Sequence, residues 1–359
     1  YHGGRGDFAV TVPADDRLLG MTDRVFAQTG NGDAEETGMR GQIANWMARR
    51  LGIPYLHGHY MRLYVNGSQY SNVMEDLAQP NNDLAEGFFP AAGTGDLYKV
   101  AIWFEFNDDD NGFQPVQATT QAFSSPGQGL KLARYRWNWQ TRGWLGTANN
   151  YTNIFNLIQA ANASENYAAS MSAIADMEEW MRVFAFNRIT GNWDAWTYNV
   201  GQNMYLYFQP GERAKLIPWD IDFVFGLGEG SNTALGGGNL GGNCQDPVGN
   251  RFYDEPAFRR ALWRAFADAI NGPLRSAEYQ PQISARSAVL KNNGFLVGGS
   301  NGLRDPRGIS TYIEARRAFI QQQLTAADKS FGITSNGGND FVSSQPVAPP
   351  RRSSASALP

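Results

Sequence analysis

The chain has 359 residues, 42% of them hydrophobic, which is the composition of a globular protein with one large core or two modest ones. It carries 30 basic against 34 acidic side chains, and the resulting net charge of −4 argues against nucleic acid or an anionic membrane surface as a partner. Its one cysteine, Cys244, excludes an intramolecular disulfide and a zinc–thiolate site, and no apolar run approaches the roughly 20 residues of a membrane span.

The first third of the chain reads mainly as sheet. Alternating apolar and polar residues predict a strand over residues 8–12, and apolar side chains at spacings of three and four predict a helix over residues 38–50. The dipeptide Asn66-Gly67 follows an alternating run and predicts a hairpin. A further strand is expected over residues 96–106, and the polar stretch NDDDNGF at residues 107–113 predicts a tight turn.

From Asn153 onward the pattern becomes mostly helical, with two strands in between. A glycine-rich segment over residues 227–243 follows the second of these strands. The Pro/Ser-rich residues 343–359 are typical of a linker or a disordered end. The sequence predicts helices over residues 153–163, 167–191, 255–270 and 310–324, and strands over residues 203–208 and 215–226, the last ending in a turn.

Two carboxylates, Asp220 and Asp222, lie two residues apart in the apolar stretch IPWDIDFVFG. An ionised carboxylate that leaves water needs a cation or hydrogen-bond donors nearby. On a strand the two side chains would share one face, where their charges repel each other unless a cation lies between them. This pattern indicates a metal site, and the alternative is a turn cap or an ion pair with an arginine such as Arg62 or Arg182.

Three further polar residues follow the order found in two-lobed phosphoryl-transfer enzymes. In such enzymes a lysine of the sheet-rich lobe holds phosphates, while carboxylates and an asparagine of the helical lobe hold divalent ions and orient the acceptor hydroxyl. The candidates are Lys99 in GDLYKV, Asp194 in GNWD and Asn203 in GQNMYLY. Each also has a structural interpretation: a lysine that reaches solvent, a turn aspartate and an asparagine that bridges backbone groups.

Five segments, in the same order, resemble the spore-coat CotH family of atypical protein kinases. They are MRGQIANWMARRLGIP, MRLYVNG with Glu75 downstream, GDLYK, GNWDAW followed by GQNMYLY, and IPWDIDFVFG. The resemblance runs from about Met39 to Leu324. It implies an α+β, two-lobed kinase-like fold, with a strand-rich nucleotide lobe over about residues 1–145 and a helical catalytic lobe over about residues 146–342.

The resemblance also implies an activity and a location. It implies a Ser/Thr protein kinase that uses ATP with Mg²⁺ or Mn²⁺ to phosphorylate surface or coat proteins, and a chain that is exported or coat-associated. Asp194 resembles the catalytic-loop aspartate, and Lys99 and Glu75 resemble nucleotide-binding residues. The positions that resemble metal ligands are Asp220, Asp222 and Asn203.

Two other classes of protein remain open. A metal-dependent glycosyltransferase would use Asp220 and Asp222 as a D-x-D motif for Mn²⁺ and a nucleotide-sugar, which explains these aspartates but not the other three residues. A catalytically inactive, pseudokinase-like surface module is the third hypothesis. It is motivated by the first strand, GGRGDFAVTV, where Arg5 is the one basic residue and the family carries a lysine nearby.

Overall fold

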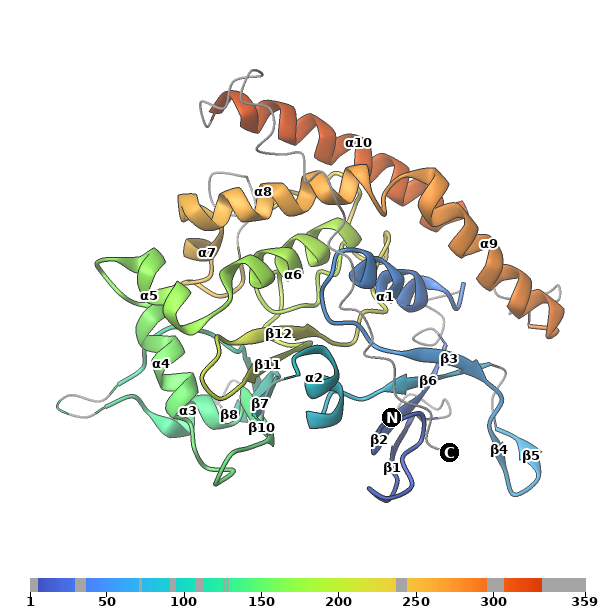
Figure 1. Ribbon diagram of the computed structural model, residues 1–359, viewed down its shortest axis with the longest axis horizontal. Helices are drawn as coiled ribbons and strands as arrows, with labels where there is room; N and C mark the ends of the chain where they lie inside the picture. Colours follow the sequence, from blue (N-terminus) through green and yellow to red (C-terminus); the bar gives the residue numbers. More distant parts are fainter. Residues whose placement is uncertain are drawn as a thin grey trace, which may run out of the picture.

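The computed structural model describes residues 6–29, 37–70, 73–90, 95–106, 113–124, 127, 129–236, 244–295 and 307–330. These residues form a mixed α+β structure in which antiparallel sheets lie beside a layer of helices (Figure 1). Nearly all of the polar turn expected at residues 107–113, much of the glycine-rich segment and the whole Pro/Ser-rich tail lie outside the described residues.

The first sheet is built from the amino-terminal part of the chain, and its strand order is β1-β2-β6-β3. A buried ion pair between Arg24 Nε and Asp76 Oδ1, 2.7 Å apart, links β2 to β6. The expected hairpin forms where predicted, because Asn66 and Gly67 both take the positive φ that its tight turn requires. The strands are β1 (Phe8–Thr11), β2 (Asp23–Gln28), β3 (Gly58–Met61), β6 (Met74–Ala78) and the hairpin pair β4 (Tyr64–Val65) and β5 (Ser68–Gln69).

The second sheet joins strands from both sides of position 145, in the order β10-β7-β11-β12. Its central strand β7 places Lys99 opposite Gln140 on one neighbour and opposite Tyr205 on the other. The prediction of a single strand over residues 96–106 is wrong, because β7 ends at Val100 and the chain then enters a separate hairpin. The strands are β7 (Asp96–Val100), β10 (Trp139–Gly143), β11 (Met204–Phe208) and β12 (Lys215–Pro218), with β8 (Trp103–Phe106) and β9 (Phe113–Val116) in the hairpin.

Both faces of the second sheet are covered, and each face belongs to a different hydrophobic cluster. Tyr98 and Leu206 lie in the large cluster with helix α6 (Met177–Thr190), whereas Leu97 and Tyr205 lie in a smaller cluster with helix α2 (Asn82–Phe88). Side chains alternate along a strand, so Lys99 extends from the same face as Leu97, toward the smaller cluster.

The helices form two layers over the large cluster. Figure 1 shows α6 next to the second sheet and α1 beside α6, above β3 of the first sheet, with α8, α9 and α10 outside them. No helix among the described residues has the length and apolar character needed to cross a membrane. The remaining helices are α1 (Arg40–Arg50), α3 (Leu132–Arg136), α4 (Thr152–Ala161), α5 (Tyr167–Ile174), α7 (Asn250–Asp254), α8 (Pro256–Asn271), α9 (Ser276–Asn292) and α10 (Arg307–Ser330).

Two predictions about elements near the polar residues are wrong. The helix expected over residues 167–191 is two helices, because Ala175 is extended and the Asp176 side chain caps α6 by accepting from the Glu179 amide. The strand expected over residues 215–226 ends at Pro218, and Asp220 follows with a φ of +53°. The argument that Asp220 and Asp222 share a strand face therefore does not hold.

Candidate active site

Asp194 lies on the turn that follows helix α6. The helix ends because Gly191 takes a left-handed conformation, and the backbone amide of Trp196 then bonds to the Gln202 carbonyl oxygen at 2.7 Å. This closure brings two amide side chains to the Asp194 carboxylate. Gln202 Nε2 donates to Oδ1 and Asn203 Nδ2 donates to Oδ2, both at 2.8 Å. Burial raises the pKa of Asp194, and the two donated hydrogen bonds oppose that rise.

Asn203 connects Asp194 to the acidic segment after β12. It is buried just before β11, with a φ of +56°, and its carbonyl oxygen accepts from the Trp219 amide at 3.3 Å. Asp220 follows Trp219 directly. Since the amide nitrogen of Asn203 is used on Asp194, its side-chain oxygen is the atom that it can offer to a cation.

Burial and neighbouring negative charges raise the pKa of both Asp220 and Asp222. Burial, followed by the Asp220 charge, raises the pKa of Asp222 to about 7. Burial, followed by the Asp194 charge, raises the pKa of Asp220, and Lys99 opposes this rise. The Asp220 side chain is open to solvent, yet the protein around it removes enough water to disfavour its charge. The Asp194 charge thus acts on both Asp220 and Asp222, and the Asp220 charge acts on Asp222, so a cation among the three carboxylates would relieve this repulsion.

The arginine partners proposed as the alternative for these aspartates are engaged elsewhere. Arg182 pairs with Asp268 at 3.2 Å, and Arg62 Nη2 donates to the Asn293 carbonyl oxygen at 2.5 Å.

Lys99 lies close enough to the acidic segment to respond to its charge. Burial lowers the pKa of Lys99, the Arg142 charge lowers it further, and the Asp220 charge opposes both. Lys99 Nζ is 5.8 Å from the centre of the Trp219 ring. The structure therefore brings one lysine and the acidic cluster to the same side of the second sheet.

Glu75 belongs to a different region. It is 8% exposed on strand β6 of the first sheet, where its charge acts on Arg286 of helix α9. Lys99 is on the second sheet, so the two nucleotide-binding candidates do not share a sheet. Their assigned roles remain predictions.

The donor set fits a cation that arrives with a phosphate ligand. The described residues contain no group of three His, Cys, Asp or Glu side chains placed to hold a metal ion by themselves. Mg²⁺ commonly takes one or two carboxylates and completes its shell with water and substrate phosphates. Asp220 and Asp222 with the Asn203 oxygen match that smaller set, and oxygen ligands suit Mg²⁺ and Mn²⁺.

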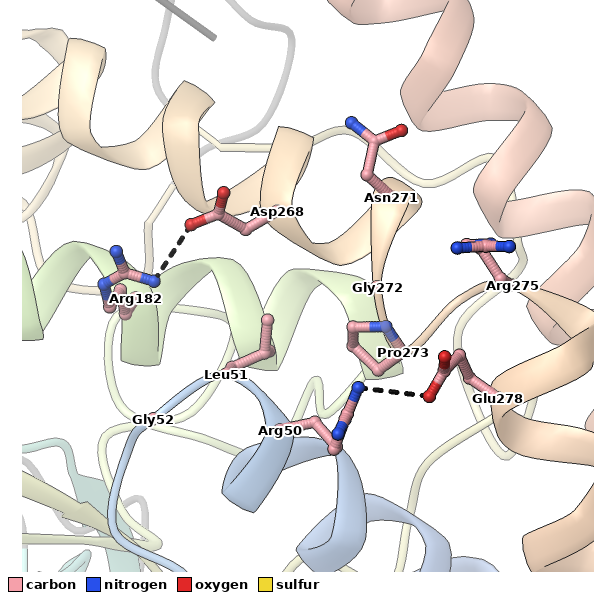
Figure 2. A pocket seen from close by; sticks show the side chains of 10 residues that line it. All are labelled: Arg50, Leu51, Gly52, Arg182, Asp268, Asn271, Gly272, Pro273, Arg275 and Glu278. Atoms are coloured by element: carbon pink, nitrogen blue, oxygen red, sulfur yellow. Dashed lines mark hydrogen bonds and ion pairs between the residues drawn. The ribbon is translucent and has the colours of Figure 1, made fainter. Parts of the chain in front are cut away.

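A cavity of about 250 Å³ lies elsewhere, between the carboxyl ends of α1 and α8 and the start of α9 (Figure 2). Two ion pairs cross it, Arg50 to Glu278 at 3.1 Å and Arg182 to Asp268 at 3.2 Å. None of its lining residues belongs to the candidate set, so this cavity is not the candidate active site.

Sequence reasoning missed Gln202, whose side chain, like that of Asn203, donates a hydrogen bond to Asp194. The sequence feature that could have indicated Gln202 is its position next to Asn203, because a single amide side chain in a loop belongs to no recognisable motif.

Comparison with known proteins identifies the family. A search of curated proteins finds no match. The family described as CotH kinase protein matches residues 8–298, a range that includes every candidate site residue from Glu75 to Asp222. The resemblance drawn from the sequence is therefore confirmed, and the chain belongs to the CotH family.

Proposed function

We propose that this CotH family member is an atypical Ser/Thr protein kinase that transfers the γ-phosphoryl group of ATP to surface or coat proteins. The observation that carries the proposal is the hydrogen bond from Asn203 to Asp194, together with the Asp194 charge that raises the pKa of both Asp220 and Asp222. A two-lobed kinase-like arrangement, with the nucleotide between a strand-rich and a helix-rich part, is included in the proposal.

In this proposal the Asp194 carboxylate orients the acceptor Ser/Thr hydroxyl and accepts its proton. Two donated amide hydrogen bonds fix the plane of its carboxylate and leave other lone pairs on both oxygens to accept a hydroxyl proton. A pKa raised by burial brings the carboxylate closer to neutral pH, which favours general-base catalysis.

The other residues bind and orient the triphosphate. Lys99 contributes a half-buried ammonium that can pair with phosphate oxygens. Asp220 and Asp222, with the Asn203 oxygen, would hold Mg²⁺ or Mn²⁺, which neutralises phosphate charge when it is bound. Catalysis in this class comes mainly from positioning and charge neutralisation.

Phosphotransfer and nucleotide binding test the proposal together. The protein is incubated with γ-labelled ATP and Mn²⁺ in the presence of casein as a generic acceptor, and Asp220→Ala is the control. Label on casein or on the chain itself, lost in Asp220→Ala, is the expected result. Thermal unfolding with ATP, UDP-glucose or no nucleotide distinguishes the alternatives. Stabilisation by UDP-glucose alone would indicate a glycosyltransferase, and stabilisation by neither would indicate a pseudokinase-like module.

A further inference from the structure

The Asp194 carboxylate is held by two consecutive residues. Gln202 Nε2 donates a hydrogen bond to Asp194 Oδ1, and Asn203 Nδ2 donates one to Asp194 Oδ2, each at 2.8 Å. Asn203 also has a proposed role as a metal ligand, so its loss would have two effects. Gln202 has no such second role, and its hydrogen bond isolates the question of how Asp194 is positioned.

The backbone that carries Gln202 is fixed from the other side by residues 117–120. Gly201 donates its amide to Gln117 Oε1 at 2.5 Å. A Cβ atom at Gly201 would lie 2.5 Å from the Ala118 nitrogen, so the two segments meet at a distance that glycine permits. The close approach sets the position of Gln202 relative to the turn that carries Asp194.

Asp246 anchors this support. It is fully buried, and its carboxylate accepts from Thr119 Oγ1 at 2.7 Å, from the Thr120 amide at 2.6 Å and from Thr120 Oγ1 at 2.7 Å. Charged acceptors make hydrogen bonds roughly twice as strong as neutral ones. A continuous set of contacts therefore runs from Asp246 through residues 117–120 to Gly201, Gln202 and Asp194.

We infer that Gln202 is a positioning residue for phosphotransfer, which orients the Asp194 carboxylate through its donated hydrogen bond. The inference rests on the proposed kinase function. A carboxylate held at one oxygen can rotate about its last side-chain bond, whereas one held at both oxygens keeps its plane. Loss of this bond lowers the fraction of Asp194 side chains that face the acceptor hydroxyl.

Two substitutions separate the hydrogen bond from side-chain packing. Gln202→Met keeps the length of the side chain and removes its donor, and Gln202→Glu keeps its shape and replaces the donor with an acceptor. Hydrogen bonds to charged groups correspond to about a 10- to 100-fold effect, so we expect kcat to fall by about that factor in both variants. The KM for ATP should stay within about twofold, because the side-chain hydrogen bond of Gln202 goes to Asp194, which the proposal places at the acceptor hydroxyl rather than at the phosphates.

Gln209→Met is the matched control. Gln209 directly follows strand β11, which Gln202 precedes, and its side chain is 7% exposed. Its Nε2 donates to the Phe89 carbonyl oxygen at 2.5 Å rather than to Asp194. This variant should lower the melting temperature and leave kcat unchanged.

The outcomes distinguish this inference from the function on which it rests. Wild-type transfer with a reduced kcat in both Gln202 variants, and an unchanged KM and melting temperature, supports it. Wild-type transfer that is undiminished in Gln202→Glu, or a kcat loss matched by a loss of folding, overturns the positioning role alone. Absence of transfer by the wild-type protein overturns the proposed function and this inference with it.

Discussion

Asp222→Asn tests whether the charges of the neighbouring carboxylates Asp220 and Asp222 lower the free energy of unfolding. Burial and the Asp220 charge raise the pKa of Asp222 from its usual 3.8 to about 7. Each pH unit between these values corresponds to 1.36 kcal/mol, which sets an upper limit of about 4 kcal/mol on the penalty of ionised Asp222 in the folded protein. Because Asp222 is partly solvated and shares this repulsion with Asp220, we expect about 1–2 kcal/mol.

The sign of this effect follows from the raised pKa. Between about pH 4 and pH 7 the unfolded chain has released this proton and the folded chain has kept it, so this group makes stability fall as pH rises through that window. The penalty is complete above about pH 7 and absent below about pH 4. Asp222→Asn removes the charge, so the variant should be more stable than the wild type at pH 8 and equally stable near pH 4.

Urea unfolding at pH 8 and pH 4, without divalent ions, measures this difference. The expected gain at pH 8 corresponds to a rise in melting temperature of about 1–3 °C for a protein of 359 residues. Asp16→Asn, a change to an exposed aspartate, is the control and should have no effect. A variant that is less stable than the wild type at pH 8, or a gain that is equal at both pH values, would refute the reasoning.

Three further predictions follow from the same geometry. Asp194→Ala should lower phosphotransfer by about 10²- to 10⁴-fold while ATP still raises the melting temperature, as measured with labelled ATP and thermal unfolding; retained transfer would contradict its role. Lys99→Met should raise the KM for ATP more than it lowers kcat, as measured in ATP titrations, because it removes the ammonium placed for the phosphates; an unchanged KM would exclude Lys99 from the nucleotide site. Asp246→Ala should destabilise folding by about 3–5 kcal/mol in urea unfolding, because several buried donors lose their acceptor, and a loss below 1 kcal/mol would show that the support is not rigid.

Local patterns predicted the elements that depend on local chemistry. The hairpin at Asn66-Gly67 formed because its turn needs residues that tolerate positive φ. Helices α1, α8 and α10 formed where apolar residues recur at helical spacing. Helix α9 was not predicted, because it contains Pro281 and lacks an apolar stripe. Its place is set by packing against other helices, which a sequence pattern does not record.

The site shows the same division between local and long-range determinants. Asp194, Asn203, Asp220 and Lys99 were identified from residue type and order, and the structure brings them together. The left-handed backbone at Asp220 was not predicted, because it follows a long-range contact, the bond from the Trp219 amide to the Asn203 carbonyl oxygen, which a local pattern does not record. The placement of Glu75 in another sheet likewise depends on strand pairing over long sequence separations.

Binding of Mn²⁺ to the wild type and to Asp220→Asn, followed by electron paramagnetic resonance with and without ATP, tests the central claim most directly. If the aspartates and Asn203 hold a divalent ion that ATP also binds, ATP should strengthen Mn²⁺ binding to the wild type, and Asp220→Asn should weaken it about 10- to 100-fold. Equal Mn²⁺ affinity in the two proteins, with no effect of ATP, would contradict the account.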